Sequence, residues 1–314
     1  MRYYYAPMEG LTDSIYRKLH NKLYPGLDRY YTPFLSPTAH RCLTPKEKRE
    51  IPEIDTLDYC LIPQVLTKNS EDFLWLAQQC AELGYNEVNL NLGCPSGTVT
   101  AKGKGSGMLK DPDALDAFLF QIFNSTPLPV SIKTRIGFSS PDEFRKLLTV
   151  YNQYPICELI IHPRVRAQFY NGSVEMEIFD HAIKESKNPL CYNGNISSEN
   201  DIKALASKYP MLESVMVGRG LIADPGMLCP ENNTLETLRK FHDDLLDQYI
   251  ENFGGARNAM FRMKEHWRHM LCKFENAEKL GKQLRKTTDI NEYRHITQEI
   301  FSTLIMRQNI VPEW

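Results

Sequence analysis

The chain has 314 residues, of which 42% are hydrophobic and 24% charged, a composition typical of a globular protein with room for one barrel-sized domain and a smaller appended one. Its formal net charge of −2 at pH 7 excludes a chain that is basic throughout, although a local basic patch remains open. The eight cysteines form no C-x-x-C pair, and the sequence shows neither a signal-peptide core nor an apolar run of about 20 residues, so we expect a cytoplasmic protein without a disulfide framework, zinc site or membrane span.

Short runs rich in β-branched or aromatic residues recur along the chain, with amphipathic helical patterns between several of them. The predicted strands are residues 2–5, 28–32, 59–63, 87–92, 130–134, 158–161, 190–192 and 214–217. The predicted helices include residues 70–83, 111–123, 142–152 and 200–208, with Ser70 and Asp111 as expected N-caps of the first two. Strands that alternate with helices over ~220 residues predict a TIM (β/α)8 barrel, and a doubly wound sheet is the alternative.

The pattern changes after residue 232, beyond which only helical periodicity is seen up to about residue 308. We expect breaks at Gly254–Gly255 and near Gly281, and Asn233 with Glu236 resembles a capping box. The sequence therefore predicts two domains, a barrel over residues 1–232 and an all-α helical bundle over residues 233–314.

Functional side chains gather where the predicted strands end, which in a TIM barrel is the edge that carries the ligand site. The residues at these ends are Met8, Gln64, Asn91, Cys94, Lys133, Arg135, His162, Asn193 and Arg219. A single polar strand end is ordinary turn chemistry, but most of eight is hard to explain by turns alone, so we interpret these residues as parts of one site.

Cys94 stands out because a strand with alternating polar and apolar residues ends in Gly93-Cys94-Pro95. The period of two places Asn89 and Asn91 on one face of this strand. Gly93 permits a tight turn and Pro95 restricts the backbone just after the sulfur, which suggests a thiol held for chemistry. A buried structural cysteine is the alternative, and the segment alone does not decide between them.

Two glycine-containing turns, at residues 193–195 and 218–220, follow the last two strands. Loops at this place in barrels commonly bind a phosphate through backbone N–H groups, to which Arg219 would add a charge-assisted hydrogen bond. Lys133 inside a barrel needs an anion or a polar ring, or else an ion pair. His162 is a candidate base or hydrogen-bond donor, and no cluster of ligands accompanies it, so no metal is expected.

Two basic segments complete the pattern. Residues 98–110 combine three glycines and three lysines and form either a lid that meets a polyanion or a solvated loop. Residues 257–286 carry nine Lys and Arg against three Glu, with aromatic residues between them. Such a face predicts contact with a phosphate backbone, and a solvated helix face is the alternative.

In their order and combination these motifs resemble the tRNA-dihydrouridine synthases over essentially the whole chain. The resemblance rests on residues 6–13, Gln64, residues 89–96, residues 133–137, Ile161-His162, Asn193-Gly194 and Gly218-Arg219. It implies a TIM barrel with a C-terminal helical domain, FMN at the strand ends, NADPH or NADH as reductant and tRNA as the partner. We expect a monomer.

The resemblance also implies roles for individual residues. Ala6, Pro7 and Met8 would line the flavin, Gln64 and Lys133 would bind its ring, His162 would lie against it, and Asn193, Gly194, Asn195, Gly218 and Arg219 would hold its phosphate. Cys94 would be the proton donor, Asn91, Arg135 and Arg164 would contact the uridine, and Lys279, Lys282 and Arg285 would contact the surrounding tRNA. Two departures from the family pattern are Pro163 and Val165 in the segment after His162, and Tyr192 in place of an alanine.

The implied reaction reduces the C5–C6 double bond of a uridine, which is expected to lie in the D-loop. Hydride would pass from FMN to C6, and the thiol of Cys94, with a reference pKa of ~8.5, would be protonated at neutral pH and give a proton to C5. The uridine would have to leave its stack to react. The alternatives are an FMN barrel oxidoreductase that acts on a small molecule, like a dihydroorotate dehydrogenase or an ene-reductase, and a tRNA-binding protein with a vestigial barrel.

Overall fold

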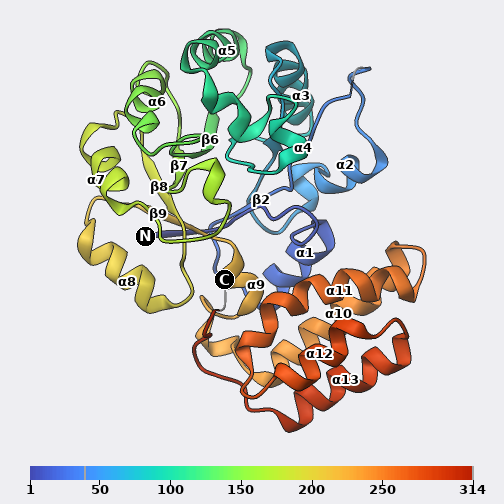
Figure 1. Ribbon diagram of the computed structural model, residues 1–314. Coiled ribbons are helices and arrows are strands. Elements are labelled where there is room, and N and C mark those ends of the chain that lie inside the picture. Colours follow the sequence, from blue (N-terminus) through green and yellow to red (C-terminus); the bar gives the residue numbers. More distant parts are fainter. Residues whose placement is uncertain (39, 313–314) are drawn as a thin grey trace. The chain divides into compact units, whose positions relative to one another are not determined.

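The computed structural model describes residues 1–38 and 40–312 (Figure 1). Contacts between Cα atoms divide the chain into two compact units. The first contains Met1–Pro7, Asp28–Gly194 and Pro210–Met216, and the second contains Met8–Leu27, Asn195–Tyr209 and the chain from Val217 onward. The predicted domain boundary after residue 232 stays a prediction.

A parallel sheet forms the centre of the first unit. Its strands are β1 (Arg2–Tyr5), β2 (Arg29–Tyr31), β3 (Leu61–Ile62), β4 (Gln64–Val65), β5 (Val88–Leu92), β6 (Val130–Arg135), β7 (Leu159–His162), β8 (Leu190–Asn193) and β9 (Ser214–Val217). Within the described residues the strand order is β3-β2-β1-β9-β8-β7-β6-β5-β4. Of the third predicted strand, residues 59–63, only Leu61–Ile62 form β3; Pro63, which has no N–H to give to the ladder, separates it from β4, which begins just beyond the predicted strand. Because β3 pairs with β2 and β4 pairs with β5, the sheet is nearly closed, which confirms the TIM barrel.

Helices surround these strands in the first unit, and α3, α5, α6 and α7 lie outside them in Figure 1. The helices are α2 (Pro45–Glu50), α3 (Ser70–Glu82), α4 (Gly97–Thr100), α5 (Pro112–Ser125), α6 (Glu143–Tyr151) and α7 (Met176–Glu185), with 3-10 turns η1 (Ile54–Thr56), η2 (Gly105–Lys110) and η3 (Arg166–Gln168). Asp111 caps α5 as predicted. The predicted cap Ser70 is wrong: Asn69 accepts the hydrogen bond from the backbone of Asp72, so α3 begins at Ser70, one residue earlier than a capping serine would require.

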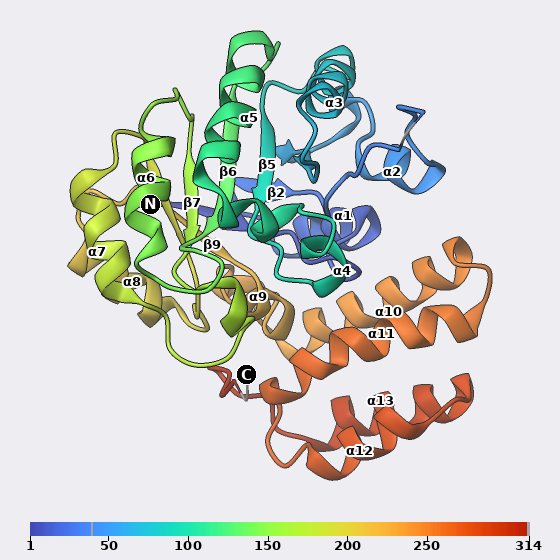
Figure 2. The same cartoon turned by 45° about the horizontal axis from the view of Figure 1, so that its top comes forward.

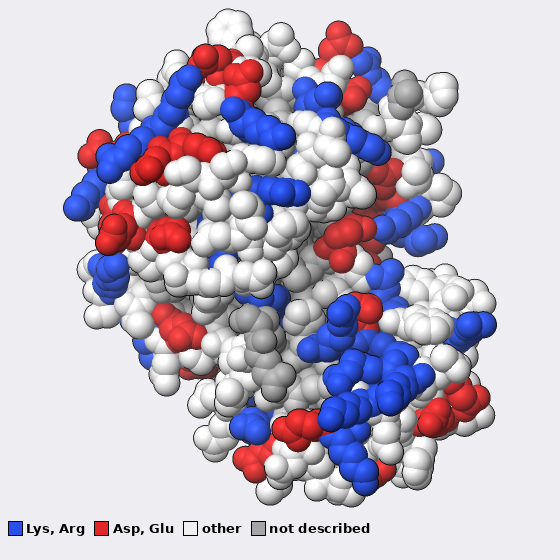
Figure 3. Space-filling view, in the orientation of Figure 1, with Lys and Arg blue, Asp and Glu red and all other residues white. Residues whose placement is uncertain are grey.

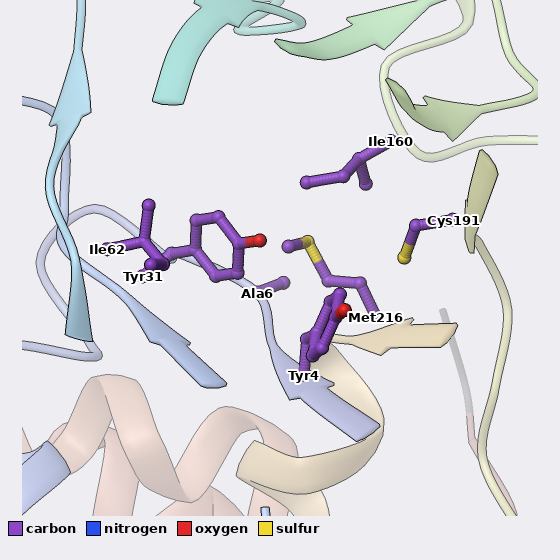
Figure 4. Close-up of a cluster of buried hydrophobic side chains, with 7 residues drawn as sticks. All are labelled: Tyr4, Ala6, Tyr31, Ile62, Ile160, Cys191 and Met216. Atoms are coloured by element: carbon purple, nitrogen blue, oxygen red, sulfur yellow. The ribbon is translucent and has the colours of Figure 1, made fainter. Parts of the chain in front are cut away.

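The interior of the barrel is filled by side chains from several strands, as a small barrel requires. Figure 4 shows seven of them, Tyr4, Ala6, Tyr31, Ile62, Ile160, Cys191 and Met216. The rings of Tyr4 and Tyr31 lie with their centroids 6.0 Å apart. This packed layer closes the barrel beneath the strand ends, so a ligand has to bind at the mouth and not within the sheet.

The second unit is helical. Its helices are α1 (Ser14–Leu23), α8 (Glu199–Lys208), α9 (Arg219–Ala223), α10 (Leu235–Asn252), α11 (Ala256–Met270), α12 (Glu278–Lys286) and α13 (Ile290–Thr303), with 3-10 turns η4 (Pro230–Asn232) and η5 (Leu271–Lys273). Figures 1 and 2 show α10 beside α11 and α12 beside α13. No helix in the described part of the chain is both long and apolar enough to span a membrane.

Two local predictions for this unit are wrong and one is confirmed. The break at Gly254–Gly255 separates α10 from α11 as expected. Gly281 lies inside α12, where a Cβ atom would be only 2.7 Å from Leu271 Cδ1, so close packing and not a helix break explains this glycine. The N-cap of α10 is Thr234, whose side chain accepts from the Thr237 backbone, and not Asn233.

Candidate functional site

A chain of buried amide hydrogen bonds runs across the mouth of the barrel. Gln64 on β4 donates to Asn89 on β5 over 2.7 Å, and Asn89 donates to Ser131 Oγ on β6 over 2.9 Å. Asn91 Nδ2 in turn donates to Gln64 Oε1 over 2.7 Å. Each amide therefore fixes the orientation of the next, and the alternation along β5 brings both asparagines to the same face, as predicted.

The amide of Asn91 holds the turn that carries Cys94. Its Oδ1 accepts hydrogen bonds from the backbone N–H of Gly93 at 3.0 Å and of Cys94 at 2.9 Å. On the other side, the carbonyl of Cys94 accepts from the backbone and hydroxyl of Ser106, at 3.2 and 2.7 Å. The half-buried thiol is thus attached to a backbone that is fixed from both sides.

The glycine-rich segment after Cys94 packs against this turn. It forms α4 and η2, and Ser106 is fully buried. Gly105 has a positive φ of 57°, and a Cβ there would lie 3.1 Å from both the Cβ and the carbonyl oxygen of Cys94. At this point of contact the segment is a support for the thiol, a role that the sequence reasoning missed when it treated the segment as a lid or a solvated loop.

The register of the sheet pairs Lys133 on β6 with Asn91 on β5, three residues before Cys94. Burial, together with the positive charge of Arg135, lowers the pKa of Lys133 to about 8, and Lys133 also interacts electrostatically with Cys94 and Cys191. Among the described residues its ammonium has no hydrogen-bond partner. A buried ammonium without a hydrogen-bond partner, close to amide side chains, fits a ligand that has an electron-rich ring or a carbonyl group.

The two arginines that were expected to face a uridine are almost fully buried, each with 1% of its surface exposed. Arg135 donates to the carbonyls of Gly93 and Val165, both over 3.0 Å. Arg164 lies 3.1 Å from His162 Nε2 and also donates to the carbonyls of the following loop. In this structure both guanidinium groups hold the loops around Cys94 and His162 in place.

The turn after β8 is tightly packed. Asn193 donates from its side chain to the carbonyl of Met216 on β9 over 2.7 Å. A Cβ on Gly194 would lie 3.2–3.5 Å from Val174, from the hydroxyl of Tyr192 and from the ring of His162. Gly194 therefore keeps the backbone open beside His162, and Tyr192 fills the space next to it.

The second unit contains the other predicted phosphate turn. Asn195 has a positive φ of 40°, and its Oδ1 accepts a hydrogen bond from Arg219 over 3.3 Å. Gly218 precedes α9, and a Cβ on Gly220 would come within 2.3 Å of the Ile196 carbonyl oxygen. The chain around Asn195 and Ile196 thus approaches the start of α9 closely, and the Arg219 guanidinium reaches back to Asn195.

A family model described as dihydrouridine synthase (Dus) matches residues 4–307 of the chain. The chain belongs to the dihydrouridine synthase family.

Relatives with curated names agree with this assignment. A "Probable tRNA-dihydrouridine synthase 2" of Bacillus subtilis is 28% identical over 94% of this chain and 92% of its own length. A "Probable tRNA-dihydrouridine synthase" of Staphylococcus aureus is also 28% identical, over 94% of this chain and 91% of its own length. The resemblance inferred from the motifs is thereby confirmed at the level of the family.

Solved structures that are similar to this chain share its fold. Morphinone reductase in complex with tetrahydroNAD matches with a TM-score of 0.50 at 11% identity, over 75% of this chain and 87% of that one. Histamine dehydrogenase from Rhizobium sp. 4-9 matches with a TM-score of 0.53 at 11% identity, over 84% of this chain and 49% of that one. At this identity the likeness is evidence for the fold alone.

The residues of this chain that were expected to line a flavin lie as follows. Ala6 follows β1 and is buried in the barrel interior, Pro7 is half-buried, and the backbone of Met8 donates to Thr12 Oγ1 over 2.9 Å. Gln64 is buried, and both ends of its amide are bound to asparagines. The free ammonium of Lys133 is therefore the feature of this mouth that best fits a bound flavin ring.

The basic tail divides into different environments. Lys279, Lys282 and Arg285 on α12 are exposed, and none of them forms an ion pair with another described residue. Figure 3 shows Lys and Arg gathered on the helical unit in the region of α12. Lys273, which the sequence reasoning counted on the same face, is fully buried and pairs with Asp224 over 2.5 Å, so that part of the prediction is wrong.

Proposed function

We propose that this protein is a tRNA-dihydrouridine synthase that reduces the C5–C6 double bond of a uridine in the D-loop of tRNA. The proposal includes FMN at the barrel mouth and NADPH as the reductant. The observation that carries it is the turn of Cys94, because Asn91 and Ser106 fix the backbone of a half-buried thiol next to the free ammonium of Lys133. The family assignment and the tRNA-dihydrouridine synthase names of the relatives support the choice of substrate.

FMN, when bound, supplies the hydride that C6 of the uracil ring receives. The residues of this chain would hold the reacting groups and provide the proton. Lys133 would donate a hydrogen bond to the flavin ring, and Asn193, Gly194, Asn195, Gly218 and Arg219 would hold its phosphate. Cys94 gives its thiol proton to C5, so that one hydride and one proton saturate the double bond, and the thiolate regains its proton from solvent.

The exposed cations of α12 would hold the tRNA around the reacting nucleotide. Lys279 and Lys282 lie three residues apart on one face of the helix, at a spacing that suits adjacent phosphates. Contacts of this kind give affinity without reading sequence, whereas the target uridine has to leave its stack and enter the barrel mouth.

The proposal is tested by replacing the thiol. Wild type, Cys94→Ala and Cys94→Ser would be incubated with NADPH and unmodified tRNA transcripts, and dihydrouridine would be mapped in the product. Cys94→Ala should retain its flavin but form product ~10²–10⁴-fold more slowly, as expected for loss of a positioned acid. Cys157→Ala, which removes another half-buried thiol in the same unit, is the matched control.

Each part of the proposal has its own negative result. Undiminished product from Cys94→Ala would remove the thiol from its role. If the reduced flavin of the wild-type protein is reoxidised by a small enone or pyrimidine but not by tRNA, the substrate is a small molecule and tRNA is refuted. The identity of the released flavin, the rates with NADPH and NADH, and the mapped position decide the finer points.

A further inference from the structure

Two consecutive aromatic residues, Phe169 and Tyr170, lie exposed on the loop after β7. Each has 40% of its surface exposed, although aromatic side chains of this size are usually buried. The guanidinium carbon of Arg166 lies 5.0 Å from the ring centroid of Phe169, and that of Arg135 lies 5.5 Å from the ring of Tyr170. Each exposed ring thus has a cation beside it.

The same two arginines bind the carbonyls on either side of Cys94. Arg135 Nε donates to Gly93 O over 3.0 Å, and Arg166 Nε donates to Pro95 O over 3.2 Å. The aromatic pair is therefore joined, through one arginine for each ring, to both ends of the turn that carries the thiol. This connection was not visible in the sequence, where no role was considered for the two aromatic residues.

The backbone of Phe169 is held in an unusual conformation, with φ of 51° and ψ of −100°. Side chains other than glycine rarely adopt such angles unless the surrounding structure imposes them. Here the chain is fixed on both sides, by hydrogen bonds from Phe169 N to Arg166 O at 3.1 Å and from Asn171 N to Gln168 O at 2.8 Å. A strained residue with an exposed ring, fixed beside the candidate site, points to binding.

We propose that Phe169 and Tyr170 form a stacking platform for an unpaired nucleotide next to the uridine that is reduced; this rests on the proposed function. Single-stranded RNA is commonly held by bases that stack on aromatic side chains, and nearby arginines add attraction for the backbone phosphates. Two cations that are not fully buried, Arg166 and Lys110, both lie against the ring of Phe138, and their positive charge suits a polyanion. Occupancy of the platform would also steady the Cys94 turn through Arg135 and Arg166.

The first test compares Phe169→Leu with Phe169→Tyr, since leucine keeps apolar volume and tyrosine keeps an aromatic ring. Phe169→Leu should raise KM for tRNA about tenfold, within the range of ~5–150-fold that corresponds to the loss of one stacked base. Phe169→Tyr, which keeps the ring, should have the KM of wild type. Flavin content and KM for NADPH should stay unchanged. Phe120→Leu, at an aromatic residue on α5 that is 61% exposed, is the matched control and should bind tRNA like wild type.

A KM for tRNA within twofold of wild type in Phe169→Leu would overturn the platform. A raised KM for NADPH with unchanged tRNA binding would also overturn it, because the rings would then belong to a nicotinamide or adenine site.

A second measurement does not depend on turnover. In Phe169→Trp, the added indole fluorescence should be quenched when unmodified tRNA binds, and in Phe120→Trp it should not. If wild type forms no dihydrouridine but the quenching is seen, the proposed function fails while RNA stacking stands. If wild type is active and the quenching is absent, the platform alone is refuted.

Discussion

The role of Asn91 gives a prediction that separates contact with substrate from support of the thiol. Asn91→Ala removes three hydrogen bonds, which are those to Gly93 N, Cys94 N and Gln64 Oε1. At about 1 kcal/mol each, their loss lowers the free energy of unfolding by about 3 kcal/mol. For a chain of this size that corresponds to a decrease of about 5 °C in Tm.

The catalytic effect should be larger than the effect on substrate binding. A displacement of the thiol by about 1 Å costs on the order of 100-fold in rate, so we expect kcat to fall about 100-fold while KM for tRNA changes by less than about threefold. Thermal unfolding monitored by dye fluorescence and steady-state formation of dihydrouridine give the two quantities.

Asn89→Ala is the control for this experiment because Asn89 is equally buried on the same strand and also loses hydrogen bonds, but it does not touch the Cys94 turn. It should be destabilised by a comparable amount with a smaller decrease in kcat. If Asn91→Ala instead raises KM strongly at constant kcat, then Asn91 contacts the uridine and the support of the thiol is refuted.

The remaining predictions concern the flavin, the tRNA and the phosphate turn. With its pKa lowered to about 8, Lys133 is protonated below that pH and loses its charge above it. Flavin affinity, measured from the fluorescence of free flavin, should therefore fall between pH 7 and 9.5. In Lys133→Met this pH dependence should disappear. Lys279→Glu combined with Lys282→Glu should weaken tRNA binding and reduce the slope of log K against log salt by about 1.4 or more, measured by filter binding from 50 to 300 mM salt. Gly220→Ala should lower flavin occupancy of the purified protein, because the new Cβ would meet the Ile196 carbonyl at 2.3 Å.

The α12 and Gly220 variants have matched controls, and the α12 and Lys133 predictions have defined contrary results. Lys146→Glu changes an exposed lysine on α6 and should leave the salt slope unchanged, whereas an unaltered slope in the α12 double variant would refute the tRNA contact. Gly97→Ala should retain full flavin, since the nearest atom to its Cβ is 4.0 Å away. A flavin affinity that is constant up to pH 9.5 in wild type would exclude the Lys133 ammonium as a flavin ligand.

Much of the secondary structure follows from local pattern. The strands at residues 2–5 and 214–217 match β1 and β9 to the residue, since β-branched and aromatic runs bounded by turn residues have few other solutions. The errors lie where tertiary contacts decide. Gly281 lies inside α12, where Leu271 occupies the space that a side chain would need, and Lys273 leaves the basic face because Asp224 binds it in the interior.

By itself the sequence determined the alternation of strands and helices, the polar residues at the strand ends and the motifs of the family, because these depend on residue type and on spacing along the chain. Tertiary structure decided what those residues bind to. The alternation in β5 indicates that Asn89 and Asn91 share a face, but only the register of β4, β5 and β6 shows that Gln64, Asn89 and Ser131 form one hydrogen-bonded chain. Likewise, Phe169 and Tyr170 became candidates only when the fold placed their arginines against Gly93 and Pro95, since hydrogen bonds between distant loops leave no periodic signal in the sequence.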